Sequence, residues 1–180
     1  MRISTRIISS ISLLIAMSIV LTRLASIRIA IGGIEGIRIG FGKLPIILSG
    51  IMFGPISGGI VGSLSDIVGY LIQPMGPYLP HFTVISALSG ALPPLLLYLL
   101  RNINYHYILK IVIINTITII TTDLFLVPYT LNVIFHMPIQ ILIYPRLVSV
   151  PVNIIIYTYI LQIFNRRKVI NIKYLENQNY

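Results

Sequence analysis

One stretch decides the fold of this chain: residues 50–82, which read GIMFGPISGGIVGSLSDIVGYLIQPMGPYLPHF. Gly58, Gly62, Asp66 and Tyr70 recur in it at every fourth position. On a helix this spacing puts two glycines, a carboxylate and a phenol on one face. Glycines at such intervals let a second helix approach closely inside a membrane. A carboxylate is costly in lipid, so we expect Asp66 to point into the protein and to have a partner.

The composition predicts a membrane protein with several spans. Of the 180 residues, 56% are hydrophobic and only 9% are charged, and the mean hydropathy is +0.94. Soluble domains carry roughly 25% charged residues. We expect a single domain, residues 1–180, in the plasma membrane. The chain has no cysteine and three scattered histidines, so neither a disulfide nor a metal site is expected.

Apolar runs of bilayer length predict six helices. They cover residues 7–24, 37–53, 57–72, 82–100, 108–126 and 139–164. Pro93 and Pro94 are expected to kink the fourth helix or to mark a break in its hydrogen bonding, and Pro145 and Pro151 to interrupt the sixth. Apolar residues alternate with a period of two over residues 26–41, which favours a short hairpin or an extended cover over the mouth of the bundle.

The basic residues predict the orientation. Six spans place both termini on one side, together with Arg2, Arg6, Arg101, Lys110 and the tail at 165–180, so that side is expected to be cytoplasmic. This placement explains the net charge of +9 without nucleic acid. Loops at 25–36, 73–80 and 127–138 fall on the opposite side. Four arginines lie near this outer end, against the trend, and an anionic ligand would account for them: Arg23, Arg28, Arg38 and Arg146.

The sequence lacks the motifs of an enzyme or of an ATPase. Gly42-Lys43 is followed by Leu44, so a phosphate-binding loop ending in Lys-Ser/Thr is missing. No Ser-x-x-His or Gly-x-Ser-Gly element appears in a predicted helix, and only Glu35, Asp66 and Asp123 are acids outside the tail. We therefore expect no catalytic residues and a binding subunit whose transport energy comes from partners.

The glycine-rich stretch also carries a family resemblance. The pattern Gly-Pro-x-x-Gly-x-x-x-Gly-x-x-x-Asp-x-x-Gly over residues 54–69 resembles the substrate-binding S component of energy-coupling-factor (ECF) vitamin importers. Four further pieces resemble the folate-specific branch, and the likeness extends over about residues 7–160. These pieces are Leu21-Thr22-Arg23, IRIGFG with LPI at 37–46, YLPHFT at 78–83 and Pro145-Arg146-Leu147.

The resemblance implies six helices, an outward pocket roofed by the first and third loops, and no cofactor besides folate as the transported ligand. It also implies three partners, a transmembrane coupling subunit and two cytoplasmic ATPases. The family's first helix usually contacts the coupling subunit through Ala-x-x-x-Ala, and the nearest match here is Ser12-x-x-x-Ala16. The chain departs again after Pro145-Arg146-Leu147, where Ser149 and Val150 stand in place of a frequent lysine.

Side-chain chemistry assigns roles within the predicted pocket. A carboxylate can accept both the amino group and the ring N–H of a pterin, so Asp66 is assigned to the pterin edge. Tyr70, His81 and Phe82 are assigned to the aromatic slot. Arg23 and Arg146 are the first choices for the glutamate tail. The full set predicted to contact the ligand is Arg23, Arg28, Arg38, Phe41, Asp66, Tyr70, Tyr78, His81, Phe82, Thr83 and Arg146.

Three alternatives stay open. Asp66 could instead pair with one of the arginines as a structural bridge. The ligand could be another vitamin, such as riboflavin, biotin or pantothenate. The chain could also be a structural membrane protein that carries nothing.

Overall fold

A computed structural model describes residues 5–24, 26–31, 34–74, 77–101, 103 and 106–167. For residues 26–31 and 34–39 it describes the backbone alone. Several predictions therefore fall outside the described residues. They are the side-chain roles of Arg28 and Arg38, the place of Arg2, the Gly32-Gly33 part of the first loop, and most of the polar tail.

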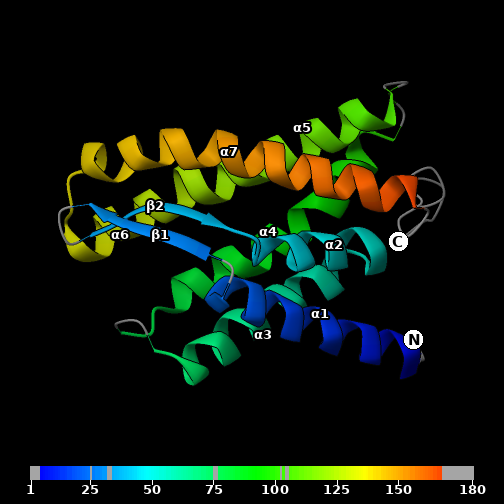
Figure 1. The fold of residues 1–180 in the computed structure, drawn as a ribbon, viewed down its shortest axis with the longest axis horizontal. Coiled ribbons are helices and arrows are strands. Elements are labelled where there is room, and N and C mark those ends of the chain that lie inside the picture. The colour runs from blue at the N-terminus through cyan, green and yellow to red at the C-terminus, as the bar shows by residue number, and fades with distance from the viewer. Residues whose placement is uncertain are drawn as a thin grey trace.

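The described residues form a bundle of helices (Figure 1). The helices are α1 (Thr5–Leu24), α2 (Lys43–Phe53), α3 (Pro55–Ile72), α4 (Pro80–Leu99), α5 (Tyr107–Ile119), the π-helix η1 (Ile120–Leu126), α6 (Val127–Phe135) and α7 (Ile139–Arg166). The segments α5, η1 and α6 form one apolar span of 29 residues, Tyr107–Phe135. With α1, α3, α4 and α7 it makes five described spans long and apolar enough to cross a membrane, and α2 is a shorter apolar helix. The predicted six-helix bundle is confirmed.

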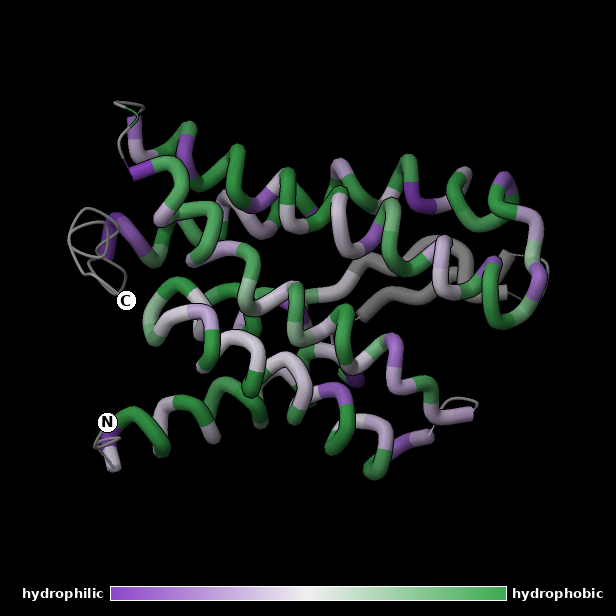
Figure 2. Tube along the Cα trace, turned by 180° about the vertical axis from the view of Figure 1, so that it is seen from behind, coloured by the Kyte–Doolittle hydropathy of each residue, from purple (hydrophilic) through white to green (hydrophobic). Residues whose placement is uncertain are grey.

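Hydrophobic residues run along the length of the long helices (Figure 2). Both termini lie at one end of the bundle, and the β-hairpin lies toward the other (Figure 1). Six passes of the chain require this arrangement, because an even number of passes returns the chain to the end at which it began.

The predicted hairpin is present between α1 and α2. Strand β1 (Ser26–Ile31) pairs antiparallel with β2 (Ile34–Gly40), with a register shift between Ile29 and Ala30. The prediction that the second helix begins at residue 37 is wrong, because the strand continues to Gly40 and α2 begins at Lys43. The period-two alternation of residues 26–41 was the better guide, since it continues past residue 37, where β2 is still extended.

Two further boundaries correct the sequence-based expectations. The loop expected at 127–138 is helical as far as Phe135, and only residues 136–138 connect it to α7. Helix α7 continues through Pro145 and Pro151, so the predicted interruption is also wrong. Helix α4 likewise continues through Pro93 and Pro94. Prolines are tolerated in membrane helices when neighbouring helices and local adjustments satisfy the freed backbone groups.

Glycines bring α2, α3 and α4 into backbone contact. A Cβ on Gly90 of α4 would lie 2.1 Å from the carbonyl oxygen of Gly58, and one on Gly50 of α2 would lie 2.0 Å from that of Gly90. One turn further along α3, a Cβ on Gly62 would lie 2.1 Å from the Ser86 carbonyl oxygen. The close helix approach predicted from the spacing of Gly58 and Gly62 is confirmed, and α4 is the partner.

Polar side chains join α5 to α7 inside the apolar core. The Asn115 amide of α5 donates to the Ile154 carbonyl at 3.2 Å and to the Thr158 hydroxyl at 3.0 Å, both on α7. Asn115 is 1% exposed, so these bonds replace the water that its side-chain NH2 group loses. Such contacts hold helices together where lipid provides no hydrophobic drive.

Candidate functional site

A cavity of about 500 Å³ opens between the helices, a size typical of small-molecule sites. Its lining comes from every helical segment except α5, and from the chain around residues 40–43 and 77–79. Six of the predicted ligand-contact residues line it: Arg23, Asp66, Tyr70, Tyr78, Phe82 and Arg146. Residues that the sequence separates by more than 120 positions therefore meet at one site.

The acidic side of the cavity lies between α3 and α4. The Thr83 hydroxyl donates to Asp66 Oδ2 at 2.7 Å. The Tyr78 and Thr83 hydroxyls are 2.8 Å apart. Thr83 has a single hydroxyl proton and gives it to Asp66, so Tyr78 is the donor in the second bond. The half-buried Asp66 carboxylate is thus held through Oδ2 by one neutral partner, and among the described residues no hydrogen bond reaches Oδ1.

This arrangement bears on the alternative role for Asp66. Within the part of the chain whose side chains are described, Asp66 bonds to Thr83 and to no arginine. The side chains of Arg28 and Arg38 fall outside that part.

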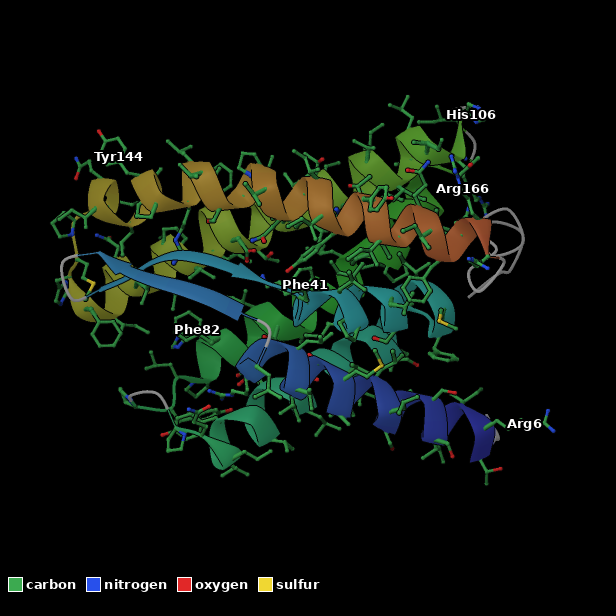
Figure 3. All side chains as sticks on the ribbon, in the orientation of Figure 1. Arg6, Phe41, Phe82, His106, Tyr144 and Arg166 are labelled. Atoms are coloured by element: carbon green, nitrogen blue, oxygen red, sulfur yellow. The ribbon has the colours of Figure 1, made fainter. Side chains whose placement is uncertain are left out.

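Aromatic rings stand next to this carboxylate. The Tyr70 and Tyr78 ring centroids are 5.2 Å apart with the rings tilted by 53°. Phe82 lies at the start of α4 and faces the same cavity (Figure 3). Phe41, His81 and Thr83 do not line the cavity, although the Thr83 hydroxyl donates to Asp66, which does. His81 is exposed, so the structure does not place it in the aromatic slot.

The basic side of the cavity lies between α2, η1 and α7. Lys43 Nζ forms an ion pair with Asp123 Oδ1 and lies 3.3 Å from the Thr122 hydroxyl oxygen. Arg146 Nη1 donates to the backbone carbonyl of Asp123 at 2.9 Å, and its Nε donates to the Leu142 carbonyl at 3.1 Å. Asp123 is therefore the common partner of two cations.

Arg23 stands apart from this group, at the end of α1. Its Nη2 donates to the backbone carbonyl of Gly69, near the C-terminus of α3. A cation there stabilises the negative end of the helix dipole. Arg23 Nε is buried and has no protein partner among the described residues, and the same holds for the hydroxyl of Ser65, which is 7% exposed. Both residues line the cavity.

Two anchors fix the junction of β2 and α2, which carries Lys43. The Ser18 hydroxyl of α1 donates to the Gly42 carbonyl at 2.8 Å, and the Tyr157 hydroxyl of α7 donates to the Gly40 carbonyl. A Cβ on Gly42 would lie 1.8 Å from Thr22 Oγ1, so α1 packs directly on this junction.

Sequence reasoning missed several lining residues. No ligand contact is predicted for Lys43 or Asp123 from the sequence, and their pairing joins positions 80 residues apart. A lysine at a helix N-terminus and an acid inside a membrane span each cost free energy. These two unfavourable placements were the sequence signal that could have predicted a pair between them. The polar residues that line the cavity and were not predicted are Ser18, Thr22, Lys43, Ser65, Ser86, Asp123, Ser149, Asn153 and Tyr157.

Comparison with known proteins identifies the family. The sequence model described as "ECF-type riboflavin transporter, S component" matches residues 2–165. The chain belongs to this family of ECF S components. It is therefore a multi-pass membrane protein and a transport subunit rather than an enzyme, and ECF S components work with an energy-coupling module.

Individual relatives agree with the family. The S component is 50% identical over 78 residues to the "Folate transporter FolT" of Clostridium novyi (strain NT), an alignment that spans 43% of this chain and 42% of that protein. Its fold matches a crystal structure of FolT bound with folic acid, with a TM-score of 0.71 and 22% identity over 99% of this chain and 96% of the other. A second solved S component of a bacterial ECF transporter gives a TM-score of 0.67 and 22% identity over 91% and 95% of the chains.

Proposed function

We propose that this S component binds folate outside the cell and delivers it through an ECF coupling module. The observation that carries the proposal is the polarity of the cavity. One wall offers a carboxylate beside aromatic rings, at Asp66, Tyr70 and Tyr78. The other offers Lys43 and Arg146. Folate has a flat pterin with adjacent N–H donors at one end and two carboxylates at the other, and each end has a matching wall.

The partial identity to FolT of Clostridium novyi supports the same ligand. Among the described side chains that line the cavity, three are basic and two are acidic, a balance that favours an anion. The second candidate is riboflavin, because the matching family model carries that vitamin in its description. Riboflavin has no carboxylate and would leave the basic wall without an anionic partner.

Direct binding measurements separate the two candidates. We expect mass spectrometry of the purified protein to reveal a co-purified folate. Titration calorimetry should give a folic acid affinity at least about 100-fold above that for riboflavin, since a mismatched or unpaired polar group costs about 1–3 kcal/mol and several are at stake. Equal or tighter binding of riboflavin would overturn the folate assignment.

The proposal includes the partners expected for the family, a transmembrane coupling subunit and two cytoplasmic ATPases. Ser12 and Ala16 are proposed to contact the coupling subunit. Both are exposed on the outer surface of α1, between the exposed side chains of Ile8 and Val20. An exposed stripe of small residues in a span suits close packing against another helix.

The proposed orientation places both termini in the cytoplasm. Arg6 and Arg166 lie at the end of the bundle that holds the termini, and Tyr144 lies at the opposite end (Figure 3). Because the chain has no cysteine, single cysteines can report the topology. A membrane-impermeant maleimide should label Tyr144→Cys in intact cells and Thr5→Cys only after lysis. The reverse pattern would invert the orientation.

A further inference from the structure

The π-helix η1 leaves the backbone carbonyl of Asp123 without a backbone donor, and the sequence explains why. The Val127 N–H donates to the Thr122 carbonyl, five residues back, instead of to the Asp123 carbonyl four residues back. The next residue that could donate to Asp123 in a π-helix is Pro128, which has no N–H. Arg146 Nη1 takes the place of the missing backbone donor, at 2.9 Å from the Asp123 oxygen.

Asp123 therefore holds two cations by different groups. Its side chain pairs with Lys43 of α2, and its main-chain carbonyl accepts from Arg146 of α7. The Lys43 and Asp123 side chains are 25% and 17% exposed, and all three residues line the cavity. Short π-helical segments occur frequently at functional sites, and this one fixes the position of both cationic groups.

Lys43 retains hydrogen-bonding capacity toward the cavity. An ammonium group has three donors. Two of them have partners among the described residues, Asp123 Oδ1 and the Thr122 hydroxyl, which is itself 2.9 Å from the Thr118 carbonyl. One N–H remains for a group inside the cavity.

The position of Lys43 argues against a purely structural pair. It is the first residue of α2, where the helix dipole opposes a positive charge, and the first turn of α2 holds no acid. A largely buried ion pair adds little net stability by itself, because the cost of desolvating both charges offsets their attraction. Lys43 lines a ligand-sized cavity, and binding an anion there is a better explanation for a lysine at this position than the ion pair alone.

We infer that Lys43 is a ligand-contacting residue that takes a carboxylate of the transported molecule, and that Asp123 is a positioning residue that holds Lys43 beside Arg146. The inference rests on the proposed function, because the carboxylate is that of the folate tail. It adds to the tail site a lysine that the arginine pattern of the sequence did not predict.

Two ligands and four variants test the inference. Folic acid and its diamide, in which both tail carboxylates are amides, share the pterin but differ in charge. Lys43→Gln should weaken folic acid about tenfold or more, the range of one hydrogen bond between charged groups, and change the diamide less than twofold. Asp123→Asn should keep a smaller preference for folic acid, since Lys43 is retained but loses the carboxylate that positions it. Arg166→Gln removes an exposed cation at the other end of the bundle and serves as the control.

The double variant Lys43→Met/Asp123→Asn guards against misfolding. It removes both members of the pair, so no lone charge is left in the half-buried site. This variant should lose the preference for folic acid while its thermal stability stays close to that of the wild type. If the wild type binds folic acid and both Lys43 variants keep its preference over the diamide, the Lys43 assignment is overturned and the proposed function stands. If the wild type binds neither compound, the proposed function is overturned and the carboxylate assignment with it.

Discussion

The hydroxyl of Thr83 donates to Asp66 Oδ2 at 2.7 Å, from the first turns of α4 to the last turns of α3. This bond orients the carboxylate so that Oδ2 is engaged, while among the described residues no hydrogen bond reaches Oδ1. Gly58 and Gly62 stand two turns and one turn earlier on the same face of α3, where α4 is in backbone contact. The close packing of the two helices thus sets where Asp66 lies in the cavity.

Replacing Asp66 by Asn tests the pterin assignment. The amide oxygen of Asn can still accept from Thr83, so stability should change little, whereas the amide nitrogen would turn a donor toward the donors of the pterin. We expect a loss of roughly 1–3 kcal/mol in folate binding, measured by calorimetry with folic acid and with a tail-less pterin. Because both ligands contain the pterin that Asp66 is assigned to bind, both affinities should fall equally. Wild-type affinity for both ligands would rule out contact between Asp66 and the pterin.

Two glycines of α3 provide a matched test of the packing. A Cβ at Gly62 would meet the Ser86 carbonyl oxygen at 2.1 Å, whereas one at Gly59 would meet that of Ala87 at 3.8 Å, an ordinary contact. Gly62→Ala should therefore cost about 1–3 kcal/mol or more through overpacking. Gly59→Ala should be neutral or stabilising by up to about 1 kcal/mol, because alanine favours the helix. Unfolding in detergent measures both, and similar stabilities for the two variants would contradict the packing described.

The exposed stripe on α1 predicts a defect in coupling without a defect in binding. In Ser12→Leu/Ala16→Leu, bulky side chains should keep the coupling subunit from packing closely, so uptake should fall to background while folate affinity is unchanged. Met17→Trp adds bulk to another exposed position of α1, outside the stripe, and should transport normally. Normal uptake by the double variant would remove Ser12 and Ala16 from the interface.

The source of energy gives a further prediction. The sequence has no phosphate-binding loop, so the purified chain should bind its vitamin but hydrolyse no ATP. Proteoliposomes that contain this chain alone should accumulate no folate when ATP is supplied. ATP-driven uptake under those conditions would refute the assignment of energy coupling to partners.

The sequence could predict the features that depend on local pattern. Apolar runs of bilayer length located the helices, and the spacing of Gly58, Gly62 and Asp66 gave the face of α3 that meets α4. The family, the bundle and the hairpin were predicted correctly because composition, periodicity and motifs are local properties of the chain. The second helix was placed six residues too early, since apolar content alone does not separate a strand from the helix that follows it.

Only the tertiary structure decided the basic side of the site. Nothing local connects Lys43 with Asp123 or Arg146, which lie on three different helical segments. Their meeting depends on how α2 packs against η1 and α7, and on a π-helix that leaves the Asp123 carbonyl free to accept from Arg146. Sequence pattern reports the face that each helix turns inward. Which charged groups then meet is set by the packing of those faces, because an ion pair needs contact between side chains and not proximity along the chain.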